Sequence, residues 1–277
     1  MEPLVLRIAA LFYLLGAGRA LLGALRPKEG RPRTGFVAVA LAMALHVGAL
    51  VLRAIELGGF PVVGIHDGLS GFGLLACALA LVVATRGGVP QVLSFTAPMV
   101  AVLVLLASFM NTQGAGIQPN MRSAWLVVHI GLALLGDATF AIAGVVAIVY
   151  LVQEGRLKRK KLATPTTGLH NLPALEVLDR VGLRLIQWGF PLMTLGLLSG
   201  ALYGHEVWGA YWTWDPRNTV SALVWLLYAV MLHARITVGW RGKKAAMLTV
   251  FGVVVLLLAF IGLGLAGVGT HGKDYVA

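Results

Sequence analysis

The chain has 277 residues, of which 58% are hydrophobic and 12% are charged, and its mean hydropathy is +0.86. A soluble domain carries about 25% charged residues, and 277 residues could not bury this much apolar surface, so the composition excludes an ordinary soluble protein. The net charge of +11 does not indicate nucleic-acid binding, because the basic residues form short clusters between apolar runs, as the topology signals of membrane proteins do.

Eight apolar runs are long enough to cross a bilayer, which takes about 20 helical residues. In chain order they are Leu4–Leu25, Phe36–Leu57, Gly68–Thr85, Val89–Met110, Ser123–Val152, Val181–Tyr203, Thr219–Val238 and Ala246–Val268. The first run contains Arg7 and Arg19 and no clear cleavage site follows it, so we expect a span and not a signal peptide. The sequence predicts an all-α polytopic membrane protein whose residues 1–277 form a single membrane domain, with no soluble domain attached.

Lysine and arginine are concentrated in alternate connections between these runs. The odd-numbered connections contain Arg26, Lys28, Arg31, Arg33, Arg86, Arg156, Lys158, Arg159, Lys160, Lys161, Arg241, Lys243 and Lys244. In the other connections, Arg53 and Arg122 lie near span ends. The positive-inside rule therefore places the odd connections in the cytoplasm, and it places both termini and segment 204–218 outside.

Cys77 is the one cysteine of the sequence and lies within an apolar run. The chain has no Cys-x-x-Cys motif, so any thiol chemistry must come from a partner. We expect Cys77 to be a small buried hydrophobic residue.

The connection between the sixth and seventh runs is rich in aromatic residues, with three tryptophans within seven residues. If it is helical, one face holds four of its side chains: Trp208, Tyr211, Trp212 and Asp215. The ordinary interpretation is an aromatic belt at the membrane surface. The alternative is a flat platform for a large planar ligand, which would gain buried area and stacking against indole rings.

The same connection resembles the WWD signature of the haem-handling proteins of cytochrome c biogenesis. The matching residues are Trp208, Gly209, Trp212, Trp214 and Asp215, followed by Pro216 and Arg217. Flanking motifs resemble the CcsA (ResC) branch: Leu178-Asp179-Arg180, Gly189-Phe190-Pro191-Leu192, Leu195-Gly196 with Gly200, Val224-Trp225-Leu226 with Tyr228, and Leu232-His233-Ala234-Arg235. The strong resemblance covers residues 123–271, and the first four spans match loosely. The chain departs from the family at Asn218, where the family usually has Glu.

The resemblance implies a function in the bacterial inner membrane. The chain would bind haem b and deliver it to the outer face. There haem would be attached to an apocytochrome c Cys-x-x-Cys-His segment, together with a ResB-type membrane subunit. The sequence leaves open whether the chain is itself an enzyme, such as the membrane subunit of a haem lyase, because nothing in it resembles a nucleophile–base pair for covalent catalysis.

Histidines are the expected iron ligands, because haem iron accepts one ligand on each ring face. The resemblance implies that His129 and His271 are paired ligands of an outer haem site. His129 lies about 9 Å into the fifth span and His271 follows the last one. The residues expected to contact haem beside them are Trp208, Gly209, Tyr211, Trp212, Trp214 and Asp215. The resemblance further implies a second pair within the membrane, His46 and His233.

Other polar residues have weaker assignments. His66 and His205 are expected to be solvated or structural, and nothing recommends His170 as a ligand. Arg53 or Arg122 could bind a haem propionate, since arginine suits carboxylate recognition. An ion pair of Arg53 with Glu56 or Asp67 explains Arg53 equally well. Asp137, near the middle of the fifth span, has no assigned role.

Three alternative functions stay open at the level of sequence. One is a haem exporter or chaperone without ligation activity, as in the CcmC branch. Another is a HemX-type regulator of haem synthesis, although such relatives tend to have a degraded tryptophan motif and this motif is nearly intact. The third is a haem-free transporter, which only the number of helices suggests.

Overall fold

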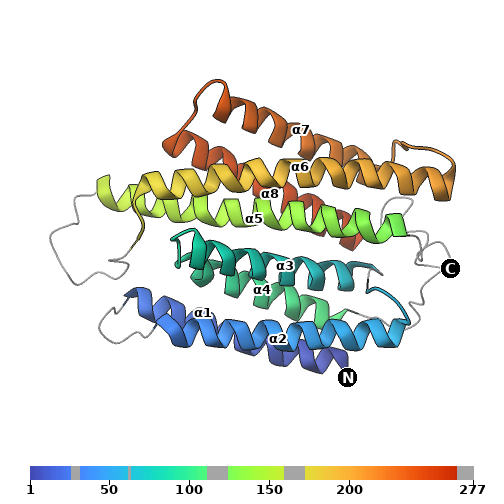
Figure 1. Cartoon of the computed structure of the whole chain (residues 1–277), viewed down its shortest axis with the longest axis horizontal. Helices are drawn as coiled ribbons and strands as arrows, with labels where there is room; N and C mark the ends of the chain where they lie inside the picture. The colour runs from blue at the N-terminus through green and yellow to red at the C-terminus, as the bar shows by residue number, and fades with distance from the viewer. Residues whose placement is uncertain (26–31, 62–63, 111–123, 159–171, 267–277) are drawn as a thin grey trace.

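The computed structural model describes residues 1–25, 32–61, 64–110, 124–158 and 172–266, and its regular elements there are all α-helices (Figure 1). In chain order these are α1 (Glu2–Leu25), α2 (Pro32–Leu57), α3 (Gly64–Arg86), α4 (Val92–Phe109), α5 (Ala124–Lys158), α6 (Leu175–Trp208), α7 (Pro216–Ile236) and α8 (Gly242–Ala266). Each of these eight helices is long and apolar enough to cross a membrane. The prediction of an all-α protein with eight candidate spans is confirmed.

The two longest helices extend well beyond their predicted spans. α5 has 35 residues and α6 has 34, which corresponds to about 50 Å each at 1.5 Å per residue. The hydrocarbon core of a bilayer is about 30 Å thick, so both helices extend beyond it. Because α6 continues to Trp208, the predicted outer connection 204–218 is half helical, and the segment between α6 and α7 is residues 209–215.

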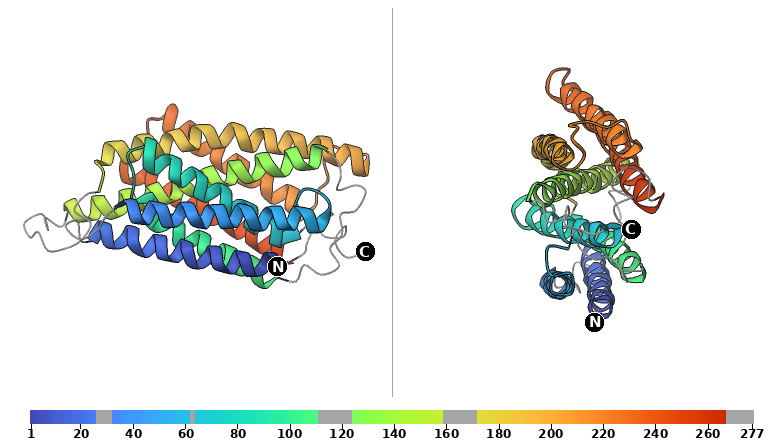
Figure 2. Two further views of the ribbon diagram at one scale, coloured as in Figure 1. Left: turned by 60° about the horizontal axis from the view of Figure 1, so that its bottom comes forward. Right: turned by 90° about the vertical axis from the view of Figure 1, so that its right-hand side faces the viewer.

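The helices lie side by side along one common direction, with α5 in the middle of the bundle (Figures 1 and 2). α5 packs along α6 and also contacts α3 and α8, while α1 packs against α2 and α4. α7 lies at one edge of the bundle and contacts α6 and α8. The first four helices therefore form one side of the molecule, and α6, α7 and α8 form the other.

The two ends of the bundle differ in composition. At one end α1 begins, α6 ends and α7 begins; we call it the tryptophan end because it carries residues 209–215 (Figure 1). The opposite end, which we call the basic end, carries Arg86, Arg156, Lys158, Arg241, Lys243 and Lys244. The N-terminus and the tryptophan segment thus share one end, as the charge pattern predicts. Which side of the membrane that end faces stays a prediction.

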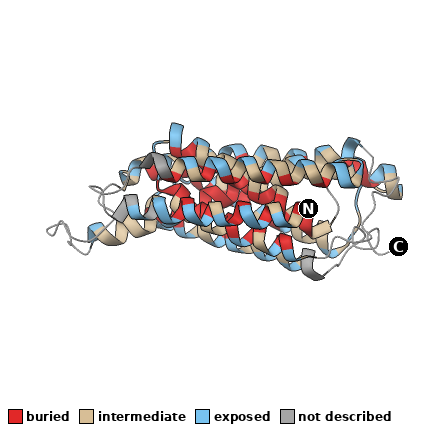
Figure 3. Cartoon of the chain, turned by 90° about the horizontal axis from the view of Figure 1, so that it is seen from below, coloured by how far each residue is buried: buried red, intermediate tan, exposed pale blue. Residues whose placement is uncertain are grey.

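Buried residues fill the middle of the bundle, and the outward faces are exposed and apolar (Figure 3). Small residues allow α5 and α6 to approach closely, as is common between membrane helices. A Cβ atom added at Gly136 of α5 would lie 2.9 Å from the backbone nitrogen of Met193 in α6. One added at Gly196 of α6 would lie 3.2 Å from the backbone nitrogen of Ala133. This contact fixes the register of α5 on α6. As expected, Cys77 is fully buried.

A buried ion pair joins three helices at the basic end. Arg235 of α7 lies 3.1 Å from the Asp179 carboxylate of α6 and also donates to the Asp179 carbonyl at 3.1 Å. The backbone N–H of Gly242, where α8 begins, donates to the same carboxylate at 3.4 Å. The Leu-Asp-Arg and His-Ala-Arg motifs therefore meet in space and hold the ends of α6, α7 and α8 together.

Candidate functional site

The end of α6 determines the path of the tryptophan segment. Gly209 adopts φ 70°, in the left-handed region that favours glycine, and its N–H donates to the His205 carbonyl at 3.0 Å. The helix therefore stops at Trp208. The face that Trp208, Tyr211, Trp212 and Asp215 would share in a continuous helix does not form, because residues 209–215 are not helical.

Asp215 and Asn218 form the N-terminal cap of α7. Asp215 accepts hydrogen bonds from the backbone N–H of Asn218 and from the Thr213 hydroxyl, both at 2.9 Å. The Asn218 amide donates to the hydroxyl and the carbonyl of Thr213, at 2.9 and 3.2 Å. Asp caps a helix in this way because its carboxylate satisfies N–H groups that have no intrahelical partner. The Asn at the family's usual Glu position belongs to this cap.

The aromatic side chains of the segment divide into two groups. Trp208 is half-buried and meets Tyr203 edge-on at a centroid distance of 5.6 Å. Trp212 and Trp214 are exposed and nearly perpendicular to each other, with an interplanar angle of 81°. Tyr211 stacks on His205 at 4.2 Å. The indoles offer apolar faces at this end, but in this structure they do not form one flat surface.

His129 presents one ring nitrogen that is free to bind a metal. Its Nδ1 atom lies 2.8 Å from the carbonyl oxygen of Gly196. A carbonyl can only accept, so Nδ1 carries the hydrogen, and Nε2 of the neutral ring keeps its lone pair. None of the hydrogen bonds between described residues involves Nε2 of His129. A histidine that donates its other N–H to a backbone carbonyl is the usual form of a metal-ligating histidine.

Two glycines of α6 form the seat of this ring. Gly196 supplies the carbonyl that accepts from Nδ1, and the same carbonyl accepts from the Ser199 hydroxyl at 2.9 Å. A Cβ atom at Gly200 would lie 2.7 Å from both Cε1 and Nδ1 of His129, closer than van der Waals contact allows. Gly196 and Gly200 both belong to the flanking motifs that resemble the CcsA branch. In the structure both lie against the His129 ring.

The inner pair of expected ligands does not meet in this structure. His271 lies outside the described residues, so its position relative to His129 stays a prediction. His46 is on α2 and His233 is on α7, at opposite edges of the bundle (Figures 1 and 2). The His46 ring is fully buried, with Nε2 at 2.9 Å from the Ser70 hydroxyl and Nδ1 at 3.3 Å from the Tyr13 hydroxyl. His233 is exposed and lies near Thr237. Haem iron could reach His46 only if those contacts were broken.

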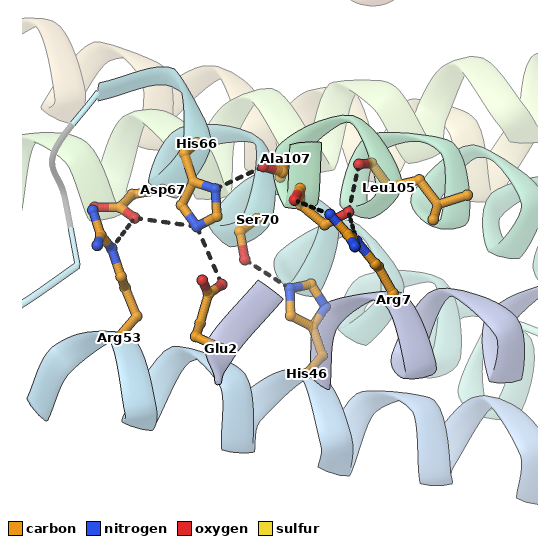
Figure 4. Close-up of polar contacts among 10 residues, drawn as sticks. Glu2, Arg7, His46, Arg53, His66, Asp67, Ser70, Leu105 and Ala107 are labelled. Atoms are coloured by element: carbon orange, nitrogen blue, oxygen red, sulfur yellow. Dashed lines mark hydrogen bonds and ion pairs between the residues drawn. The ribbon is translucent and has the colours of Figure 1, made fainter. Parts of the chain in front are cut away.

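A buried cluster of charged residues ties the first four helices together at the tryptophan end (Figure 4). Arg53 donates to the Asp67 carboxylate at 3.1 Å. An ion pair of Arg53 with Asp67 is one of the alternatives to propionate binding that the sequence leaves open. His66 contacts the Glu2 carboxylate at 3.1 Å and the Ala107 carbonyl at 2.8 Å. His66 is therefore structural and buried, not solvated. Arg122 lies outside the described residues.

Arg217 belongs to the tryptophan motif, and the sequence assigns it no role of its own. It is half-buried in the first turn of α7. Its Nε atom is buried and has no hydrogen-bond partner among the described residues. The sequence contains a signal that Arg217 has a role other than stabilising its helix. A basic residue directly after an Asp-Pro helix start lies at the positive end of the helix dipole, which is unfavourable.

Comparison with known proteins shows the family of the chain. Residues 63–271 match the family model described as Cytochrome C assembly protein. The chain belongs to the cytochrome c assembly protein family. Within the family it is 32% identical to the cytochrome c biogenesis protein CcsA of Synechococcus sp. (strain CC9902), over 88% of this chain and 87% of that one. It is 34% identical to the CcsA of Prochlorococcus marinus (strain MIT 9313), over 84% of this chain and 81% of that one.

A solved structure of another cytochrome c biogenesis protein has the same fold. It is the cytochrome c haem lyase CcmF, which matches with a TM-score of 0.63 and 19% identity over 99% of this chain. The chain spans 50% of that lyase. At this identity the likeness concerns the fold alone. Of the elements described above, α3–α8 lie in the part matched by the cytochrome c assembly model, and α1 and α2 precede it.

Proposed function

We propose that this chain binds haem b at the tryptophan end and presents it on the extracytoplasmic side for covalent attachment to apocytochrome c. The observation that carries the proposal is Nε2 of His129, which has no hydrogen-bond partner among the described residues and whose orientation is set by the Gly196 carbonyl. Iron needs a neutral imidazole nitrogen of this kind. The exposed rings of Trp212 and Trp214 supply apolar faces at the same end.

The second axial ligand in this proposal is His271, five residues beyond the end of α8 at Ala266. α8 ends at the tryptophan end, so a chain segment of this length can reach the same region (Figure 1). His129 and His271 would together hold the iron. The inner pair of His46 and His233 is not needed for this site.

The contribution of the chain to attachment is positioning. When bound, haem would supply two vinyl groups, to each of which an apocytochrome cysteine thiol adds, with sulfur bonding to one vinyl carbon and the thiol hydrogen passing to the other. His129 and the tryptophans would hold the haem so that its reactive edge meets the thiols, which raises their effective concentration. A ResB-type subunit is the proposed partner. Cys77 is buried and single, which suits a division of labour in which thiol reduction is done by other proteins.

The test is purification of the full chain, with its absorbance spectrum recorded as isolated and after haem addition. The wild-type protein should show a Soret band. His129→Ala and His271→Ala should each weaken haem binding and lower maturation of a c-type cytochrome in the same cells. His170→Ala is the matched control, because that histidine precedes α6 at its basic end in the sequence and should change neither quantity.

Two results would contradict the proposal. One is a wild-type protein that binds no haem under conditions that support cytochrome maturation. The other is full haem binding together with normal maturation in both His129→Ala and His271→Ala. Loss of maturation with intact haem transfer to a separate lyase would instead assign the chain the role of a haem chaperone.

A further inference from the structure

Arg217 stands where a helix disfavours a cation. Asp215 caps α7 and Pro216 follows it, so Arg217 lies in the first turn of the helix. The N-terminus of a helix carries a partial positive charge, which repels arginine and attracts anions. Arg217 therefore does not stabilise α7 through the helix dipole.

The guanidinium of Arg217 is incompletely satisfied within the described part of the chain. Its Nε atom is buried and donates no hydrogen bond to any described residue. None of the ion pairs among the described residues includes Arg217. The Arg53 guanidinium at the same end also has a buried nitrogen without a partner, Nη2, but unlike Arg217 it forms an ion pair, with Asp67. A buried N–H without an acceptor is costly, and a ligand that supplies an acceptor removes that cost.

The position of Arg217 relative to His129 indicates which ligand would do so. Arg217 lies in the first turn of α7 and His129 in the second turn of α5, and both helices begin at the tryptophan end (Figure 1). A histidine whose Nδ1 is held by a carbonyl and an incompletely paired guanidinium are therefore both placed at the tryptophan end. A ligand that meets both needs must combine a metal with an anionic group.

We propose that Arg217 binds a carboxylate of the same haem whose iron His129 binds, that is, a propionate. The inference rests on the proposed function and adds to it the group that sets the in-plane orientation of the haem. A guanidinium binds a carboxylate through two parallel N–H donors, which fixes direction as well as distance. An acidic side chain of a partner protein offers the same chemistry, so the test separates the two sources.

The test compares haem with haem dimethyl ester, in which both propionates are neutral. The full chain is titrated with each ligand, and the dissociation constants are taken from the Soret absorbance. For the wild type we expect haem to bind at least about tenfold more tightly than the ester, as one charge-assisted pair implies. Arg217→Gln should remove most of that preference by weakening haem binding, with ester binding unchanged. Arg184→Gln, an exposed arginine of α6 near the basic end, is the control and should keep the preference.

Arg217→Lys covers the case in which Arg217→Gln does not fold. Lysine keeps the charge but not the two-pronged geometry, so it should retain part of the preference. The inference is overturned if Arg217→Gln lowers haem and ester binding equally, which is the behaviour of a structural residue. It is also overturned if neither affinity changes, which is the result expected when the carboxylate belongs to a partner protein. Failure of the proposed function itself looks different, because the wild type would then bind neither ligand, or His129→Ala would bind both as the wild type does.

Discussion

At the scale of single residues, the orientation of His129 depends on two glycines that have no side chain. His129 can direct Nε2 away from α6 only because residues 196 and 200 leave room for its ring. The same reasoning explains Asn218. A Glu at this position could complete the cap of α7 by accepting hydrogen bonds, whereas Asn completes it by donating to Thr213. Asn218 therefore completes the cap with hydrogen-bond donors in place of a carboxylate.

The glycine seat of His129 makes a residue-scale prediction. Gly200→Ala places a methyl group 2.7 Å from the ring, so His129 must rotate or α5 must shift. We expect haem affinity to fall by about tenfold or more while the protein stays helical, because the metal ligand is displaced from its orientation. Haem titration together with circular dichroism measures both quantities.

Gly48→Ala is the matched control for this change. A Cβ atom at Gly48 in α2 would meet nothing within 4 Å. The alanine should leave haem affinity unchanged and favour the helix by about 1 kcal/mol, since glycine is a poor helix former. Wild-type haem affinity in Gly200→Ala would show that the seat does not position the ligand.

At the scale of elements, polar contacts hold both ends of α7. At the tryptophan end Asp215 caps α7, and at the basic end Asp179 receives Arg235 and the start of α8. In lipid the apolar faces of helices gain little by meeting one another, so such polar contacts have a larger share in fixing the arrangement. α7, at the edge of the bundle, would be the helix most affected by their loss.

Asp179→Ala should therefore destabilise the protein. The substitution leaves Arg235, whose side chain is 4% exposed, without its carboxylate. We expect a loss of about 3 kcal/mol, as for other buried pairs broken from one side. Thermal or denaturant unfolding in detergent measures the change. Glu176→Ala breaks the exposed pair with Arg180 on the same helix and should cost less than about 0.5 kcal/mol. Equal losses of stability in the two variants would mean that the buried ion pair contributes no more to stability than the exposed one.

At the scale of the whole molecule, the charged cluster of α1–α4 is an internal tie, because its charged groups contact one another. Arg53 with Asp67 and His66 with Glu2 connect helices α1, α2 and α3 (Figure 4). These contacts join the two helices that precede the cytochrome c assembly match to those within it. The first four helices would then act as a support for α5, the helix that carries His129.

This view gives a prediction for the Arg53–Asp67 pair. Arg53→Gln and Asp67→Asn should each destabilise the protein by about 3 kcal/mol, because each leaves a buried charge behind. The double variant should regain part of the loss, since neither charge remains. Unfolding measurements on the three variants form the cycle. Haem affinity should be that of the wild type in the double variant, and a persistent loss there would reassign Arg53 to the propionates.

The orientation of the bundle makes a second prediction at this scale. Cys77 is the one cysteine of the sequence and is fully buried, so a cysteine introduced at the surface would be the accessible one. Trp214→Cys at the tryptophan end should react with a membrane-impermeant maleimide in intact cells. Lys243→Cys at the basic end should react only after the membrane is opened. The reverse pattern would invert the topology.

The sequence by itself determined the membrane class, the eight helices and the alternation of basic connections, because span length and charge distribution are local properties of the chain. It also pointed to the tryptophan segment and to His129 through motif likeness. Only the tertiary structure decided that Gly196 and Gly200 hold His129, that Arg53 is neutralised by Asp67, and that His46 and His233 lie at opposite edges of the bundle. Each of these facts depends on which helices pack together. In a bilayer nearly every apolar helix face can pack against another helix or against lipid, so the hydropathy pattern does not determine which helices pair. Scattered glycines and polar side chains determine it.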